Sequence, residues 1–126
     1  MAAPVYSRKQ VAEFLALLEV PAAFSNPDDL TPNLDLLRLL HTHMISTIPY
    51  ETLILHYSPN RKVELDPQRL FQKIVGDGRG RGGYCLECNL LFLYMLRELG
   101  FHTYPVGTRS RIRFHGGTPG GGYEGW

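Results

Sequence analysis

The 126 residues carry 13 lysines and arginines against 12 aspartates and glutamates, and this balance does not favour a nucleic-acid or membrane-surface partner. Hydrophobic residues make up 44% of the chain, enough for one domain, and no apolar run reaches the roughly 18 residues of a membrane span. Residues 1–5 lack the features of a signal peptide. We therefore expect a cytoplasmic, reducing location, in which both cysteines remain thiols.

The first part of the chain predicts three helices, over residues 7–18, 32–48 and 66–75. Apolar residues recur in each of them at a helical spacing. Ser7 and Asp66 stand where a side chain can cap the first turn. Pro32 and Pro67 fit the first position of a helix, where the missing N–H of proline costs nothing.

A glycine-rich segment leads into a fourth helix, which starts at a cysteine. Four of the six residues 78–83 are glycine, and the helix formers that follow continue to Gly100, a typical closing residue. Cys85 therefore lies in the first turn, where unpaired N–H groups favour an anion, and Arg79 and Arg81 are nearby in sequence. This pattern predicts a nucleophilic thiolate that a substrate can approach closely.

Beyond the fourth helix the hydrophobic period changes to two. This change predicts strands over residues 103–106 and 108–114. The second strand places Arg109, Arg111 and Arg113 on one face. A solvated strand edge explains such a stripe, and so does contact with an anion.

These elements predict an α+β fold in two parts. Residues 1–100 form a helical domain that carries the nucleophilic cysteine, and residues 101–126 hold the opening strands and Gly-rich loop of an incomplete β domain. The fourth helix is apolar almost all round through residues 90–96, so it should be buried on every side. So short a chain has little protein to cover it, and we expect it to be the N-terminal part of a longer one.

Two weaker motif matches overlap the glycine-rich segment. Gly78, Gly80 and Gly83 have the spacing of a dinucleotide-binding fingerprint, but a predicted helix precedes them where that fingerprint needs a strand. Residues 79–83 also resemble an RNA-binding Arg-Gly-Gly segment. Such segments are long and repetitive, whereas this one is short and runs into an apolar helix.

The spacing of Cys85 and Cys88 supports the strongest alternative, a non-catalytic thiol-redox or zinc-binding module complete at this length. A redox motif usually follows a strand, which the sequence does not predict here. Zinc needs two further ligands, and His41 and His43 point different ways on a helix, so no metal is predicted. Cys88 also fits a small buried hydrophobe.

Two segments resemble known motifs of one enzyme family. Residues 81–89, Arg-Gly-Gly-Tyr-Cys-Leu-Glu-Cys-Asn, resemble the signature of the arylamine N-acetyltransferases, whose cysteine carries an acyl group between coenzyme A and an amine. Residues 48–53 are similar to the family's Ile-Pro-Phe-Glu-Asn-Leu segment, with Tyr50 and Thr52 as departures. The Gly-rich residues 119–126 are similar to fungal members.

The resemblance implies a xenobiotic-metabolising acyltransferase in which the strands open a β-barrel-like domain. Cys85 would take an acetyl or related acyl group from acyl-coenzyme A, the co-substrate, and pass it to an aromatic amine; no cofactor is bound permanently. Arg109 is expected to contact a coenzyme A phosphate or a malonyl carboxylate. The implied binding residues are Tyr84, Arg109 and Ser110 for substrate, and Glu124 and Gly125 for coenzyme A.

The family's cysteine works with a histidine and an aspartate, and in family order both follow Trp126. The resemblance therefore implies an N-terminal portion that is inactive alone and needs the remainder of its own chain. Arg81 and Glu51 come one from each motif. We expect them to pair and to support the cysteine loop, because a half-buried arginine needs a carboxylate.

Overall fold

A computed structural model of the chain describes residues 3–108, 110–111 and 123–124. The helices are α1 (Arg8–Leu17), α2 (Leu34–Thr47), α3 (Leu53–Tyr57), α4 (Pro67–Phe71) and α5 (Cys85–Glu98). Two 3-10 turns, Ala22–Phe24 and Pro27–Asp29, join α1 to α2, and a π-helical turn, Gln72–Gly76, continues α4. The strands are β1 (Ser110–Arg111) and β2 (Tyr123–Glu124). No helix in the described ranges is long and apolar enough to cross a membrane.

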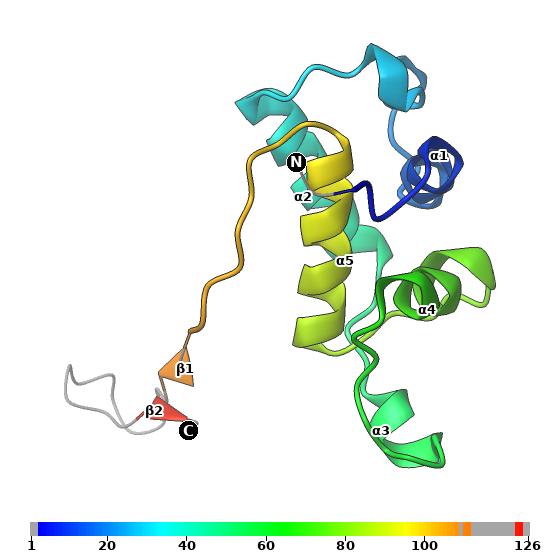
Figure 1. The fold of residues 1–126 in the computed structure, drawn as a ribbon, viewed down its shortest axis with the longest axis vertical. Helices are drawn as coiled ribbons and strands as arrows, with labels where there is room; N and C mark the ends of the chain where they lie inside the picture. The colour runs from blue at the N-terminus through cyan, green and yellow to red at the C-terminus, as the bar shows by residue number, and fades with distance from the viewer. Residues whose placement is uncertain (1–2, 109, 112–122, 125–126) are drawn as a thin grey trace.

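Helix α5 stands at the centre of the helical body, with α2 behind it and α1 and α4 to one side (Figure 1). The core forms where these helices meet, because each turns its apolar stripe toward the others. Its most deeply buried apolar side chains include Val11, Phe14 and Leu15 of α1, Leu18 just after it, Leu40 of α2, Leu70 of α4, Ile74 of the π-helical turn, and Leu91 and Met95 of α5. This core holds the first turn of α5 in place.

Capping side chains determine where the helices begin. Ser7 caps α1 and Asp66 caps α4, each by accepting the backbone N–H three residues on, which confirms both predictions. Pro32 is not the first residue of α2, because Asn33 takes the cap position and α2 starts after it. Gly100 closes α5 with a φ of 93°, a left-handed conformation that favours glycine.

The predicted α+β fold, a helical bundle followed by the first strands of a β-barrel-like domain, is wrong for the described residues. Their regular secondary structure is helical apart from the two residues of β1 and the two of β2, which pair antiparallel. Residues 103–106, predicted as a strand, have no regular structure. Thr103 is hydrogen-bonded to Arg97 and Leu93 of α5, and the chain beyond it leads toward β1 (Figure 1). Alternation predicts only which face a side chain takes, and a strand forms only with a partner for its hydrogen bonds. Of the predicted strand 108–114, only residues 110–111 are described as strand.

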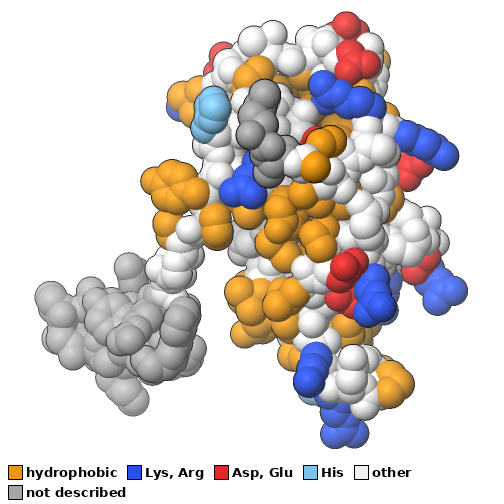
Figure 2. Space-filling view, in the orientation of Figure 1, with side chains coloured by type: hydrophobic (Ala, Val, Ile, Leu, Met, Phe, Trp, Pro, Cys, Tyr) orange, Lys and Arg blue, Asp and Glu red, His pale blue; other side chains and the backbone are white. Residues whose placement is uncertain are grey.

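Helix α5 is not buried on every side within the described part of the chain, as expected for an apolar helix in a chain with little protein to cover it. Leu91, Met95 and Leu96 face the core, whereas Leu86 is 55% exposed and Leu90 is only partly buried. Figure 2 shows hydrophobic side chains at the molecular surface along this helix. The apolar residues of α5 therefore exceed what the described part of the chain covers.

Candidate active site

A pocket of about 290 Å³ opens between α2 and α5. Met44 and Ile48, from α2 and its C-terminal end, and Phe92 of α5 give it an apolar wall. Both cysteines, Cys85 and Cys88, line the same pocket. A concave apolar wall with a few polar groups suits a small aromatic ligand, and here it also presents a thiol.

Cys85 is the first residue of α5, as the sequence predicts, and its side chain is exposed. Tyr84 precedes it as the N-cap residue, in an extended backbone conformation. The unpaired N–H groups of a helix's first turn stabilise negative charge at this position. Asn89, one turn further on, donates its side-chain amide to the Cys85 carbonyl at 2.8 Å. The thiol is thus held at a helix N-terminus and open to a substrate.

The two sequence motifs meet as neighbouring backbone segments. The Gly83 N–H donates to the Pro49 carbonyl at 3.2 Å, and the Glu51 N–H donates to the Gly83 carbonyl at 3.0 Å. Together these bonds form a parallel bridge between Tyr50 and Gly83. The rings of Tyr50 and Tyr84 lie 5.8 Å apart between centroids. The segment 48–53 therefore forms one side of the loop that leads into Cys85.

An ion pair reinforces this contact. Arg81 donates from Nε and Nη2 to the same Glu51 oxygen, Oε1, at 3.1 and 2.9 Å. The other oxygen of Glu51 accepts the Leu53 N–H at 2.6 Å. The structure brings the two sequence-predicted partners together, although their catalytic importance stays a prediction.

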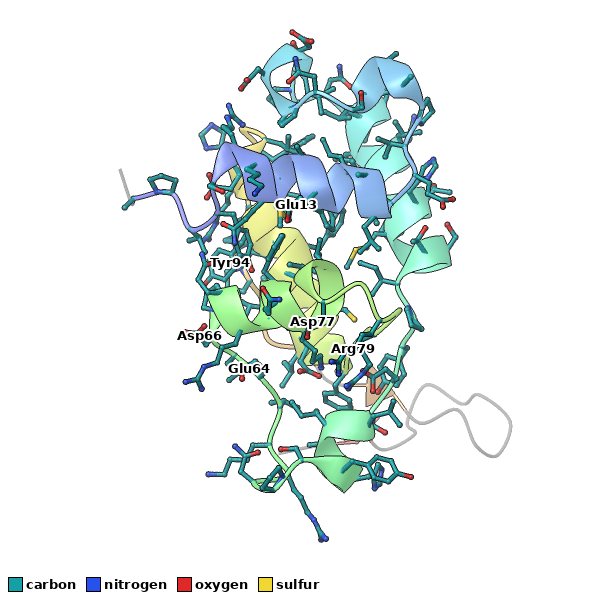
Figure 3. All side chains as sticks on the ribbon, turned by 90° about the vertical axis from the view of Figure 1, so that its right-hand side faces the viewer. Glu13, Glu64, Asp66, Asp77, Arg79 and Tyr94 are labelled. Carbon is teal, nitrogen blue, oxygen red and sulfur yellow. The ribbon has the colours of Figure 1, made fainter. Side chains whose placement is uncertain are left out.

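The Glu87 carboxylate fixes the start of α5 through hydrogen bonds, a role that the sequence analysis did not predict. It is fully buried, and its Oε1 accepts the Tyr84 N–H at 2.9 Å. Its Oε2 accepts the Glu64 N–H at 3.1 Å and a proton of Lys73 Nζ at 2.7 Å. Figure 3 shows Glu64 on the segment that leads into α4 and Arg79 on the loop that leads into α5. A glutamate three residues after the N-cap is a capping-box signal that the sequence does carry.

Lys73 links the two carboxylates of the site. Its Nζ lies 2.7 Å from Glu87 Oε2 and 4.0 Å from Glu51 Oε1, and its side chain is only 12% exposed. Arg81, Glu51, Lys73 and Glu87 therefore form a row of alternating charges beneath the cysteine loop. Such a row is favourable in a buried setting only while every member keeps its partner.

The Glu87 carboxylate gives a pH-dependent prediction. Burial raises the pKa of Glu87, but the Lys73 ammonium and the two backbone donors together hold it below its ordinary value of 4.5. A depressed folded-state pKa stabilises the fold above the unfolded-state pKa, and the contribution is lost as the pH falls through the folded value. The stability difference between wild type and Glu87→Gln should therefore be largest near pH 7 and shrink below about pH 4.5. Urea titrations of both proteins across this range measure it, and a constant difference would contradict it.

Gly82 gives a steric prediction. A Cβ at this position would lie 1.7 Å from the Pro49 carbonyl oxygen, a backbone atom that cannot move aside alone. We expect Gly82→Ala to lower the free energy of unfolding by about 1–3 kcal/mol. In the control, Gly76→Ala, the nearest atom is the flexible end of Gln72, so the loss should be smaller. Equal shifts in thermal unfolding for the two variants would rule out close approach at Gly82 as the cause.

The remaining predicted binding residues lie away from Cys85 or outside the described residues. Ser110 of β1 and Glu124 of β2 are Cα partners in the antiparallel pair, which Figure 1 shows apart from α5. Arg109 and Gly125 lie outside the described residues. Tyr84 alone is adjacent to the cysteine. The binding roles of these residues stay predictions.

The two histidines of α2 face different ways. His41 lines the pocket, and its ring centroid lies 6.5 Å from the ring centroid of Phe92. His43 instead has its Nδ1 2.8 Å from the Leu18 carbonyl oxygen. Phe92 lies about two helical turns beyond Cys85, so His41 is at the far end of the pocket. Within residues 3–108, 110–111 and 123–124, no group of three or more His, Cys, Asp or Glu side chains is placed to hold a metal ion.

Comparison with known proteins gives a consistent set of matches. Residues 33–120 match the family described as N-acetyltransferase. The N-malonyltransferase FDB2 of Fusarium pseudograminearum is 33% identical over 115 residues, which cover 84% of this chain and 33% of that protein. Arylamine N-acetyltransferase 1 of Oryctolagus cuniculus is 39% identical over 75 residues, or 60% of this chain and 24% of its own length. The arylamine N-acetyltransferase of Escherichia coli is 44% identical over 70 residues, which cover 56% of this chain and 24% of that protein.

The chain spans about a quarter to a third of the length of these relatives. The matched range contains both sequence motifs, the charged row and every residue of the pocket. No solved structure gives a significant match.

Proposed function

Because the chain belongs to the arylamine N-acetyltransferase family, we propose that Cys85 is the nucleophile of an acyltransferase. The Cys85 thiolate attacks the thioester carbonyl of an acyl-coenzyme A, the coenzyme A thiolate leaves, and an acyl-cysteine forms. An aromatic amine then attacks the acyl carbon, which releases the amide and restores the thiol. The observation that carries this proposal is an exposed thiol at a helix N-terminus in the wall of an apolar pocket.

The pocket supports an aromatic amine as acceptor. Tyr50 and Phe92 offer aromatic surface, and Met44 and Ile48 add apolar surface. An amine whose ring lies against these side chains presents its nitrogen toward the sulfur. Burial of the ring supplies the binding energy, and the fixed wall orients the nitrogen for attack.

The charged row positions the nucleophile. Glu87 holds the N–H of Tyr84, the residue before Cys85, while Arg81 and Glu51 tie the glycine loop to its neighbour. None of these hydrogen bonds is made to the Cys85 sulfur, so their contribution is to keep the first turn of α5 in one geometry. Precise placement of a nucleophile is worth far more than its contact energy, because small displacements lower the rate strongly.

A base is required to form the thiolate and to return a proton. We place it, with the aspartate that orients it, outside these 126 residues, because the relatives are three to four times the matched length. Without this base, the 126-residue chain alone is expected not to catalyse acyl transfer. His41 is at the far end of the pocket, which does not favour it as the base.

The donor is acetyl- or malonyl-coenzyme A, and Arg109 distinguishes the two. A relative is named an N-malonyltransferase, and a malonyl group carries a carboxylate that an arginine can bind. A charge-assisted contact of about 1.5–3 kcal/mol predicts a tenfold to hundredfold loss of kcat/KM for the malonyl donor in Arg109→Ala. Equal losses of kcat/KM with both donors would point to the coenzyme A phosphates as the partner of Arg109. No loss with either donor would rule out a contact between Arg109 and the donor.

Steady-state kinetics test the two-step scheme. The assay uses a protein of the family's full length that contains these 126 residues, with acyl-coenzyme A and arylamine varied together. Parallel double-reciprocal lines are expected, because the donor product leaves before the amine reacts. Intersecting lines would show direct transfer in a ternary complex and would overturn the proposal.

A further inference from the structure

The chain has two cysteines, and the proposed acyl transfer uses only one of them. Cys85 and Cys88 lie one turn apart at the start of α5 and line the same pocket. Cys85 is exposed, whereas Cys88 is partly buried with its Sγ 3.4 Å from the Gly83 carbonyl oxygen. The second thiol therefore has a defined place beside the nucleophile.

The spacing of the two residues is compatible with a disulfide bond. Helix radius and rise put Cα atoms three residues apart at roughly 5 Å, within the range of about 4.4–6.8 Å that disulfides span. The Cβ atoms, about 5–6 Å apart in a regular helix, have to approach by roughly 1–2 Å. A Cys-X-X-Cys pair at a helix start meets this requirement with a small tightening of the first turn, because the Cys85 N–H lies outside the helical ladder.

The two thiols differ in the way that a peroxide reaction requires. Cys85 is exposed and is the first residue of α5. Cys88 is less exposed than Cys85, and burial raises the pKa of its thiol, so the oxidant meets Cys85 first. An exposed first cysteine with a more buried second one, at the start of a helix, is the arrangement of reversible thiol–disulfide centres.

We propose that hydroperoxides convert Cys85 and Cys88 into a reversible intramolecular disulfide. The Cys85 thiolate attacks the peroxide, so that an S–O bond forms, the O–O bond breaks and hydroxide or alkoxide leaves. The Cys88 sulfur then attacks the Cys85 sulfenic acid, the S–S bond forms, and the oxygen departs as water with the Cys88 proton. One peroxide is reduced by two electrons and two thiols are oxidised.

The disulfide blocks the nucleophile and spares it from irreversible oxidation to sulfinic acid. Its effect on acyl transfer rests on the proposed function, whereas the thiol chemistry does not. A dithiol reductant restores both sulfurs. Cys88 thereby acts as the resolving residue of Cys85.

The experiment treats the 126-residue chain with hydrogen peroxide, alkylates the remaining thiols and measures the intact mass and the mapped peptides. Wild type is expected to lose two hydrogens, to take up no alkyl group and to recover both thiols in dithiothreitol. In Cys88→Ala, and in the more conservative Cys88→Ser, Cys85 should reach sulfinic acid roughly tenfold faster than in wild type. In the control Cys85→Ala, Cys88 should stay available to the alkylating reagent.

Equal rates of sulfinic acid formation in wild type and Cys88→Ala, both with native circular dichroism, would overturn the proposal. The two proposals also fail separately in the full-length protein. A disulfide that forms in a protein whose reduced Cys85 never accepts an acyl group overturns the proposed function alone. Acylation of Cys85 without any peroxide-dependent disulfide overturns this inference alone.

Discussion

Lys73→Met is expected to lower the free energy of unfolding by about 3–5 kcal/mol, because it leaves a buried carboxylate without its cation. Lys73 Nζ lies 2.7 Å from Glu87 Oε2, in a pair whose side chains are 12% and 0% exposed. Glu87 keeps two backbone donors, which limits the loss. Since small domains are stable by only about 5–15 kcal/mol, urea denaturation at neutral pH should show a large shift in midpoint.

Two further variants separate charge from packing. Lys73→Met combined with Glu87→Gln removes both charges, so it should be more stable than Lys73→Met alone. The matched control is Lys9→Met, whose partner Glu13 lies 3.8 Å away at the surface, so little change is expected. If the double variant lost as much as the sum of the single ones, the buried pair would not be coupled.

Cys85→Ser is expected to lower kcat/KM for amine acylation by about 10⁴-fold or more, the scale seen when a nucleophile is removed. A serine hydroxyl is not ionised near neutral pH, and the pocket presents no other exposed thiol. The fold should be unaffected, because Cys85 is exposed and serine is well accepted at a helix start. The measurement is steady-state turnover in a protein of the family's full length.

Cys88→Ala is the matched control for this prediction. It removes the neighbouring thiol one turn away, together with its contact to the Gly83 carbonyl, and puts a good helix former at that position. Under reducing conditions its turnover should stay within a few-fold of wild type, since Cys88 takes no part in the acyl transfer. Comparable losses of turnover in the two variants would mean that the substitutions act through the shape of the helix start. Cys85 would then not be the nucleophile.

Local chemistry made much of the helical part predictable. The caps at Ser7 and Asp66 and the left-handed closure at Gly100 each depend on residues within one turn, so the sequence shows them directly. The same holds for Cys85 at the first residue of α5. The Arg81–Glu51 contact was predictable only because two motifs and the rule that a half-buried charge needs a partner pointed to it.

Long-range contacts set the limit of such reasoning. Lys73 and Glu87 are 14 residues apart, and no spacing rule connects a π-helical turn with the start of the next helix. Glu87 carried a capping signal, but its complete burial depends on how α4 packs against α5. The strand expected over residues 103–106 failed because alternating polarity does not specify a pairing partner.

The most direct test of Cys85 as the nucleophile is to find which residue holds the acyl group. A full-length protein that contains these 126 residues is incubated with acyl-coenzyme A without amine, quenched in acid, and analysed by intact mass and peptide mapping. One acyl group on the peptide that contains Cys85, absent in Cys85→Ser and discharged by added arylamine, is the predicted result. Turnover of the amine with no acyl group on Cys85, or with the group on another residue, would show that Cys85 is not the nucleophile.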